Sequence, residues 1–291
     1  MHRTPRLLLA FLLGTGVATV QPAAVGQTSH KATLKPVAAT APDIPFRDSE
    51  LEVEQQLFQL ANQARQQAGA PQLALDPGLS EAARVHAQAM LEAHQLSHQF
   101  NGEQSLPQRL AATTNLQLDQ AGENVALDYD AEHGHEHLML SPPHRANLLN
   151  PAYNVVGLGV VRGGDRLYIV QDFGHALPSY SSVEVKDRVA AAVSQMRLRA
   201  GQPELVRQDL INADDAACSM AQADKLGTEP VRKLAQQFTV LTYTSLHPET
   251  LPGGTSRAIA SHNLHSVSIG ACYARTDTYP TGVYWIVLSL Q

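Results

Sequence analysis

Three short segments contain side chains that could perform chemistry together. They read LSH at residues 96–98, GEN at residues 122–124 and SPPHRAN at residues 141–147. His98, Glu123 and His144 supply two imidazoles and one carboxylate, the groups that hold a divalent metal ion or carry out acid–base catalysis once a fold gathers them. Their spacing alone does not decide whether they meet.

Helical periodicity precedes the first segment. An apolar stripe predicts a helix over residues 50–68. Asp76 followed by Pro77 is a typical helix start, an N-cap oxygen and then a ring already at helical φ. The alanine-rich apolar face of this second helix predicts close approach to another element. His86 lies on the same side, and we interpret it as a packed histidine rather than a ligand.

The third segment lies between a predicted helix and a predicted β-hairpin. Residues 131–140 favour a helix that is broken at Pro142-Pro143, so that His144 begins a new short element. Residues 155–161 and 167–173 are rich in β-branched and aromatic residues and flank a glycine turn, which predicts the hairpin.

Composition excludes some classes of protein. The chain has 291 residues, of which 44% are hydrophobic and 16% charged, enough for one large or two ordinary domains. Its net charge is −6, so it has no general attraction for nucleic acid or anionic lipid, and we expect no nucleic-acid partner.

The first residues resemble an export signal. Arg3 and Arg6 precede an apolar run over residues 7–20, and small residues before Gln27 offer a cleavage site. We expect residues 1–26 to be a signal peptide, residues 27–49 a flexible linker, and the product to be secreted or periplasmic, with no transmembrane segment after signal removal. A retained membrane anchor is the alternative.

Together the motifs resemble the secreted CAP/SCP family, which includes cysteine-rich secretory proteins, venom antigen 5 and pathogenesis-related proteins. The resemblance covers about residues 51–176. It is carried by the three segments above and by AARVHA at 82–87, SPPHRANLL at 141–149, VGLGV at 156–160 and YIVQDF at 168–173. It implies an α/β fold, a three-layer α-β-α sandwich over residues 50–178, with His98, Glu123 and His144 in its cleft.

Two positions depart from the family pattern. An aromatic position that commonly precedes the SPxHR motif corresponds to Leu138, and the second cleft glutamate of eukaryotic members has no evident match. Ser141 is the residue that could occupy its place in the cleft. The set of acidic groups is therefore incomplete.

The cleft residues leave two interpretations open. Neutral imidazoles and a carboxylate could ligate a zinc-like divalent ion and leave one coordination position free. Alternatively, His98, Glu123 and His144 hydrogen-bond one another and the backbone, and hold three loops together. A serine nucleophile at Ser97 or Ser141 is a weaker hypothesis, because it also needs an oriented base in space.

A second helix pair repeats the first. RxxAGxPxL occurs at 65–73 and 197–205, and AAxxxAQA at 82–89 and 216–223. The hairpin also returns, but the three segments with His98, Glu123 and His144 have no equivalents. We interpret residues 184–291 as a smaller, degenerate copy of the same fold that has lost its cleft and serves as a structural or partner-binding module.

Both cysteines, Cys218 and Cys272, lie in the second unit, on a predicted helix and a predicted strand. In an exported protein they could form a disulfide; two unpaired buried thiols are the alternative.

Two functions follow from these features. The first is a secreted binding module whose cleft holds a divalent metal, a small ligand, a lipid or a cell-envelope component. The second is a metal-assisted or acid–base hydrolase of an extracellular or envelope substrate that uses His98, Glu123 and His144. We favour binding over catalysis, because the family implied by the resemblance acts mainly by binding.

Overall fold

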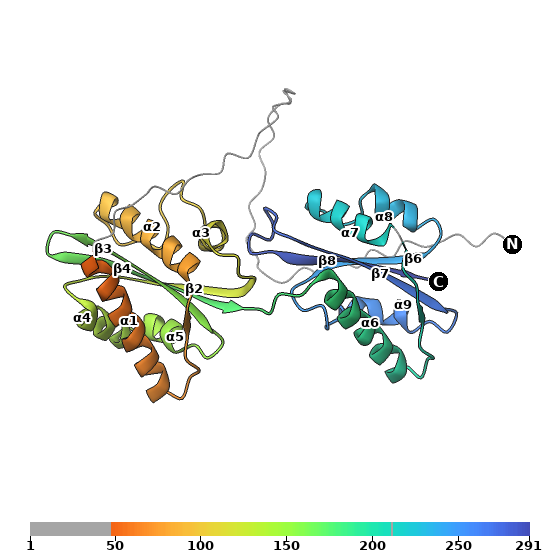
Figure 1. Cartoon of the computed structure of the whole chain (residues 1–291), viewed down its shortest axis with the longest axis horizontal. Coiled ribbons are helices and arrows are strands. Elements are labelled where there is room, and N and C mark those ends of the chain that lie inside the picture. Colours follow the sequence, from red (N-terminus) through yellow and green to blue (C-terminus); the bar gives the residue numbers. More distant parts are fainter. Residues whose placement is uncertain (1–47, 211) are drawn as a thin grey trace, which may run out of the picture.

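Two sheets of the same design organise the chain (Figure 1). The computed structural model describes residues 48–210 and 212–291. The predicted signal peptide lies outside these residues, as does nearly all of the predicted linker. In the described part of the chain, no helix is both long and apolar enough to cross a membrane.

The first sheet has the strand order β1-β3-β4-β2, with β1 parallel to β3 and the other pairs antiparallel. Helices α2 and α3 cover one face, and α1, α4 and α5 cover the other, so the domain has three layers (Figure 1). The strands are β1 (Ala74–Leu75), β2 (Leu118–Asp128), β3 (Val155–Gly163) and β4 (Arg166–Ala176). The helices are α1 (Asp48–Gln67), α2 (Pro77–Ala93), α3 (Leu106–Thr113), α4 (Ala131–Leu140) and α5 (Pro142–Leu149).

The second sheet has the order β5-β7-β8-β6, again with one parallel pair followed by antiparallel pairs. Helices α7 and α8 lie on one face and α6 and α9 on the other (Figure 1). The strands are β5 (Val206–Arg207), β6 (Thr239–Ser245), β7 (Ser266–Ala274) and β8 (Val283–Leu290). The helices are α6 (Ser182–Arg199), α7 (Ala213–Gln222), α8 (Glu229–Leu234) and α9 (Ser256–Ile259), with a 3₁₀ turn at Gly253–Thr255.

The alanine-rich face of α2 packs directly on β3. A Cβ added at Gly157 or Gly159 would collide with the backbone of α2 at Leu79 or Ala83. Glycine in the strand and alanine in the helix therefore let two backbones approach closely. This contact confirms the predicted close approach and fixes α2, which carries His86, against the sheet.

Local signals predicted several boundaries. The Asp76 carboxylate accepts a hydrogen bond from the Leu79 N–H at 2.8 Å and caps α2, as expected. The hairpin and the helix over 131–140 are also confirmed. The expectation that an element starts at His144 needs correction, because α5 begins at Pro142. A ring with φ fixed near the helical value and no N–H is well suited to the first turn.

Candidate functional site

The GEN segment lies in the middle of a strand rather than on a loop. Glu123 and Asn124 are consecutive residues of β2, an edge strand, so their side chains point to opposite faces of the sheet. Glu123 contacts residues on the α2 and α3 side, and Asn124 donates to the backbone carbonyl of His144 in α5 at 3.0 Å. One edge strand thus binds the segments on both sides of the sheet.

Glu123 is the centre of the ionic network. Its side chain is 4% exposed, and one carboxylate oxygen lies 2.9 Å from His98 Nδ1. The other oxygen accepts a charge-assisted hydrogen bond from Arg109 of α3, a guanidinium that is only 6% exposed. Arg109 also donates to the carbonyl of His98 at 3.2 Å, so the same arginine positions the histidine backbone.

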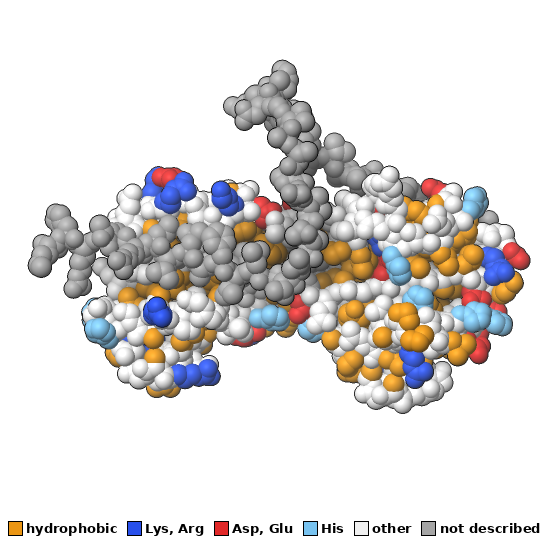
Figure 2. All heavy atoms as spheres, turned by 180° about the vertical axis from the view of Figure 1, so that it is seen from behind, with side chains coloured by type: hydrophobic (Ala, Val, Ile, Leu, Met, Phe, Trp, Pro, Cys, Tyr) orange, Lys and Arg blue, Asp and Glu red, His pale blue; other side chains and the backbone are white. Residues whose placement is uncertain are grey.

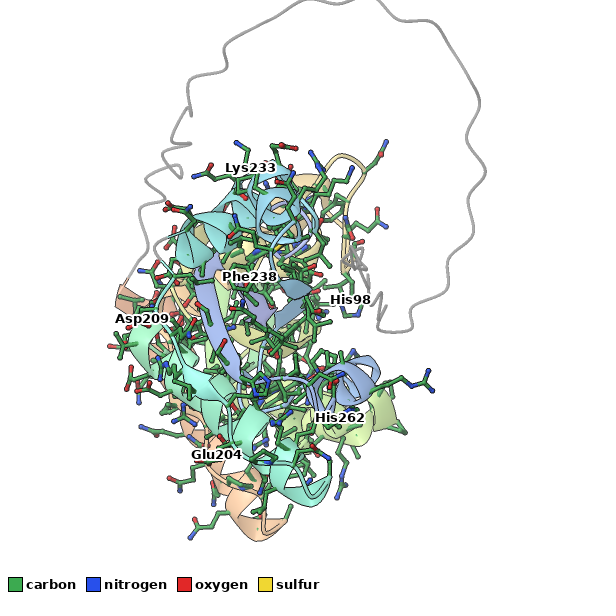
Figure 3. All side chains as sticks on the ribbon, turned by 90° about the vertical axis from the view of Figure 1, so that its right-hand side faces the viewer. His98, Glu204, Asp209, Lys233, Phe238 and His262 are labelled. Carbon is green, nitrogen blue, oxygen red and sulfur yellow. A yellow bond between two sulfur atoms is a disulfide. The ribbon has the colours of Figure 1, made fainter. Side chains whose placement is uncertain are left out.

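His98 is the exposed member of this group. Its side chain is 60% exposed, and it lies at the periphery of the molecule (Figure 3). When Nδ1 donates to Glu123, the neutral ring presents Nε2 as a hydrogen-bond acceptor on its other side. A carboxylate that fixes the ring in this way gives a defined tautomer and orientation to an exposed imidazole.

His86 and Glu103 extend the network below the surface. His86 is fully buried on α2, with Nδ1 2.6 Å from Glu103 and Nε2 2.8 Å from the Ser97 carbonyl oxygen. Glu103 also lies 3.3 Å from Arg109. His86 is therefore a packed histidine, as predicted, but it packs inside the polar network and holds the residue that precedes His98.

Asp172 of β4 lies opposite Glu123 in the strand register. Its carboxyl group is fully buried and receives no hydrogen bond from the described residues. Burial, and then the negative charge of Glu123, raise the pKa of Asp172 well above its ordinary value. Protonated Asp172 can donate its proton toward Glu123, so the two carboxyl groups share one negative charge.

His144 approaches from the opposite face of the sheet. Desolvation, and then the nearby His98, lower the pKa of His144, which favours its neutral form. Its segment is held by Asn147, which donates to the Glu123 carbonyl oxygen and to Asn124, each at 3.1 Å. The effect of His98 on this pKa is an electrostatic interaction between the two rings.

The donor set does not fit a bound metal ion as arranged. Within residues 48–210 and 212–291, no three His, Cys, Asp or Glu side chains are grouped closely enough to hold a metal. Glu123 is engaged by the positive Arg109 and by His98, so a divalent cation would have to displace a buried guanidinium. The predicted zinc ligands His98, Glu123 and His144 are therefore not arranged as a coordination sphere.

The other candidate residues have structural places in the fold. Ser97 Oγ donates to the Gln99 carbonyl oxygen at 2.7 Å, and Ser141 is the N-cap of α5 without a side-chain cap bond. Cys218 and Cys272 form a disulfide that joins α7 to β7.

Sequence reasoning did not find Arg109, Glu103 or Asp172 as parts of the site. Asp172 has a local signal, a carboxylate that follows the apolar run of β4 at residues 167–170. Arg109 and Glu103 have none, because their role depends on the path of the chain between α2 and β2.

The first domain matches a known family. Residues 58–173 match the CAP model, described as the cysteine-rich secretory protein family. The chain therefore contains a CAP/SCP domain, and this domain has bacterial relatives. The uncharacterized protein YkwD of Bacillus subtilis (strain 168) is 32% identical over 112 residues, which cover 38% of this chain and 43% of that protein.

Two solved structures are also similar. An extracellular SCP-domain protein of Bacillus anthracis strain Ames is 29% identical, with a TM-score of 0.41 and coverage of 45% of this chain and 44% of that one. An outer surface protein of Borrelia burgdorferi is 18% identical, with a TM-score of 0.40 and coverage of 45% and 95%. The match to YkwD covers 43% of that protein, so this chain spans less than half the length of YkwD.

Proposed function

We propose that this protein is a secreted binding protein whose first domain holds a small hydroxyl-bearing ligand between His98 and His144. The observation that carries the proposal is the fixed His98 ring, bonded to Glu123 on one side and exposed on the other. The export-like first residues support secretion.

The chemistry of the two rings suggests the ligand class. A neutral His98 that donates to Glu123 offers an acceptor at Nε2, and neutral His144 offers both a donor and an acceptor. Paired donors and acceptors suit hydroxyl groups, as found on the glycans of a cell envelope. Nucleic acid is disfavoured by the net charge of −6. On the face in Figure 2, Lys and Arg side chains are scattered rather than gathered into a patch.

Saturation-transfer NMR with a panel of soluble sugars, fatty acids and short peptides tests the proposal. We expect at least one sugar to bind the full chain, and His98→Ala and His144→Ala each to abolish its signal. His262→Ala changes an exposed histidine of the second domain and is the matched control. Sugar binding that survives both cleft substitutions would refute the proposal.

Acid–base hydrolysis is the second candidate. The His98–Glu123 pair favours it, since a carboxylate-oriented imidazole can act as a general base toward water. Binding remains preferred because Glu123, the second group that acid–base catalysis would use, is already paired with His98 and Arg109. Turnover of ester, peptide or glycan substrates that disappears in His98→Ala would favour the hydrolase.

We also propose that residues 184–291 are a degenerate copy of the CAP fold. The shared strand order and pairing pattern support this proposal. Arg65 and Arg197 are both fully buried and donate to matching backbone carbonyls: Pro71, Leu148 and Asn150 for the first, and Pro203, Ile259 and Ser261 for the second. Gly270, like Gly159 in the first sheet, meets the backbone of the covering helix.

Under this proposal, the strand register pairs residues of the two sheets at the positions of the site. Aligning Gly270 with Gly159 puts Val240 at the place of Glu123 and Ser289 at the place of Asp172. An apolar residue and a hydroxyl then correspond to the carboxyl pair of the first domain. The copy proposal predicts equal structural roles for Arg65 and Arg197. Arg65→Ala should therefore lower the urea midpoint of the first domain, and Arg197→Ala that of the second. If only one substitution has this effect, the proposed equivalence fails.

A further inference from the structure

The β7–β8 loop of the second domain lies against the segment that joins α3 to β2 in the first domain (Figure 1). Arg275 in this loop donates to the carbonyl oxygens of Ala111 at 2.8 Å and Leu116 at 3.2 Å. Thr281 donates to the Leu118 carbonyl oxygen at 2.9 Å. The second domain thus bonds to a short stretch that ends α3 and begins β2.

This stretch connects two residues of the site. Arg109 lies in α3, two residues before Ala111, and Glu123 lies in β2, five residues after Leu118. Carbonyl groups in the last turn of a helix lack intrahelical partners and carry the negative end of the helix dipole. A guanidinium at the Ala111 carbonyl satisfies one such group and complements that dipole.

The loop that presents Arg275 is fixed within its own domain. Asp224 accepts hydrogen bonds from the Thr276 hydroxyl at 2.7 Å and the Thr278 N–H at 2.9 Å. The Cys218–Cys272 disulfide ties the strand three residues before Arg275 to α7. The donor is therefore held in place before it reaches the first domain.

We propose that Arg275 is a positioning residue, through which the second domain holds α3 so that Arg109 keeps Glu123 and His98 in their arrangement. This inference deepens the proposed function, since it concerns the same site, and it assigns a role to the second domain. Contact between α2 and α3, at Gly78 and Thr113, holds the C-terminal end of the helix from within the first domain. Arg275 adds a bond to the same end from the second domain.

The test uses the full chain with labelled histidine rings and needs no ligand. In Arg275→Ala we expect the His98 ring resonances to move. We also expect the amides of α3 to exchange with solvent about tenfold faster, the effect of losing about one net hydrogen bond. Arg275→Lys keeps a cation and should recover part of both changes. Arg257→Ala removes an exposed arginine of α9 and should change neither.

Two outcomes overturn the inference. One is an Arg275→Ala protein with lower stability but unchanged His98 resonances and α3 exchange, which would make Arg275 merely structural. If Arg275→Ala folds poorly, the same measurements are made on Arg275→Lys and Thr281→Val. Unchanged His98 resonances in both of these variants would also overturn the inference. Because no ligand is used, sugar binding that survives both His98→Ala and His144→Ala would refute the proposed function and leave this inference standing.

Discussion

Replacing Asp172 by Asn should make the first domain more stable at neutral pH and remove a specific part of its pH dependence. The Asp172 carboxyl group is fully buried opposite Glu123, and its pKa is raised by burial and by that neighbouring charge. Asparagine keeps the shape and a donor toward Glu123 but never ionises. The substitution therefore isolates the free energy of unfolding that the domain loses by keeping Asp172 protonated.

The sign follows from proton linkage. Above the ordinary Asp pKa of 3.8, unfolded chains release the proton while the folded domain keeps it. The free energy of unfolding of the wild type therefore falls by about 1.4 kcal/mol per pH unit as pH rises, until Asp172 ionises in the folded state. The Asp172→Asn protein lacks this slope. The two proteins should be similar near about pH 4 and diverge at higher pH.

Urea unfolding followed by circular dichroism at several pH values measures the effect. The chain has one tryptophan, Trp285, which is buried in the second domain, so its fluorescence follows that domain separately. The fluorescence transition should be the same in Asp172→Asn and wild type. Asp165→Asn removes an exposed carboxylate from the β3–β4 turn and is the control. Parallel pH profiles for wild type and Asp172→Asn would show that Asp172 is ionised in the folded protein.

Three further predictions concern the site and its supports. Gly122→Ala places a Cβ against the Tyr153 hydroxyl and should lower the free energy of urea unfolding by about 1–3 kcal/mol. Tyr153→Phe in the same chain should recover part of this loss. If the stability changes of the two substitutions are strictly additive, this collision is not the cause. Replacing Cys218 and Cys272 by Ser opens a link across 54 residues, which the chain-entropy model values at about 4 kcal/mol; an unshifted Trp285 transition would contradict it. The His144 Hε1 resonance should titrate at lower pH in the folded than in the urea-unfolded protein, because desolvation and the His98 charge lower the His144 pKa. His98→Ala should therefore raise the midpoint in the folded protein. An unchanged midpoint would show that the two rings do not interact. In the pH range between the two midpoints, His144 makes the folded protein less stable as pH falls.

Elements with strong local signals could be predicted from the sequence, and β2 could not. The start of α2 is encoded by Asp76 and Pro77, neighbours whose conformations need no distant partner. Strand β2 contains Gly122, Glu123 and Asn124, and its side chains bond to other elements rather than alternate between core and solvent. The polar residues in the middle of β2 interrupt the apolar alternation that would have predicted a strand.

The candidate site could be predicted only in part for a related reason. The resemblance brought His98, Glu123 and His144 into consideration, but it did not show that Arg109 neutralises Glu123. A buried carboxylate needs a partner of opposite charge, and the tertiary structure decides which residue lies close enough to be that partner. Arg109 pairs with Glu123 at the place where two histidines and a carboxylate alone would suggest a metal ion.

The proposed comparison of the two domains separates residues that support the layers from residues of the site. Buried Arg197 and the close approach at Gly270 have counterparts in the first domain, whereas the proposed alignment pairs Val240 and Ser289 with Glu123 and Asp172. An apolar residue and a hydroxyl at these places need no compensating buried arginine. The supporting role that we propose for the second domain therefore rests on its contact through Arg275, because that contact lies on the segment that carries Arg109.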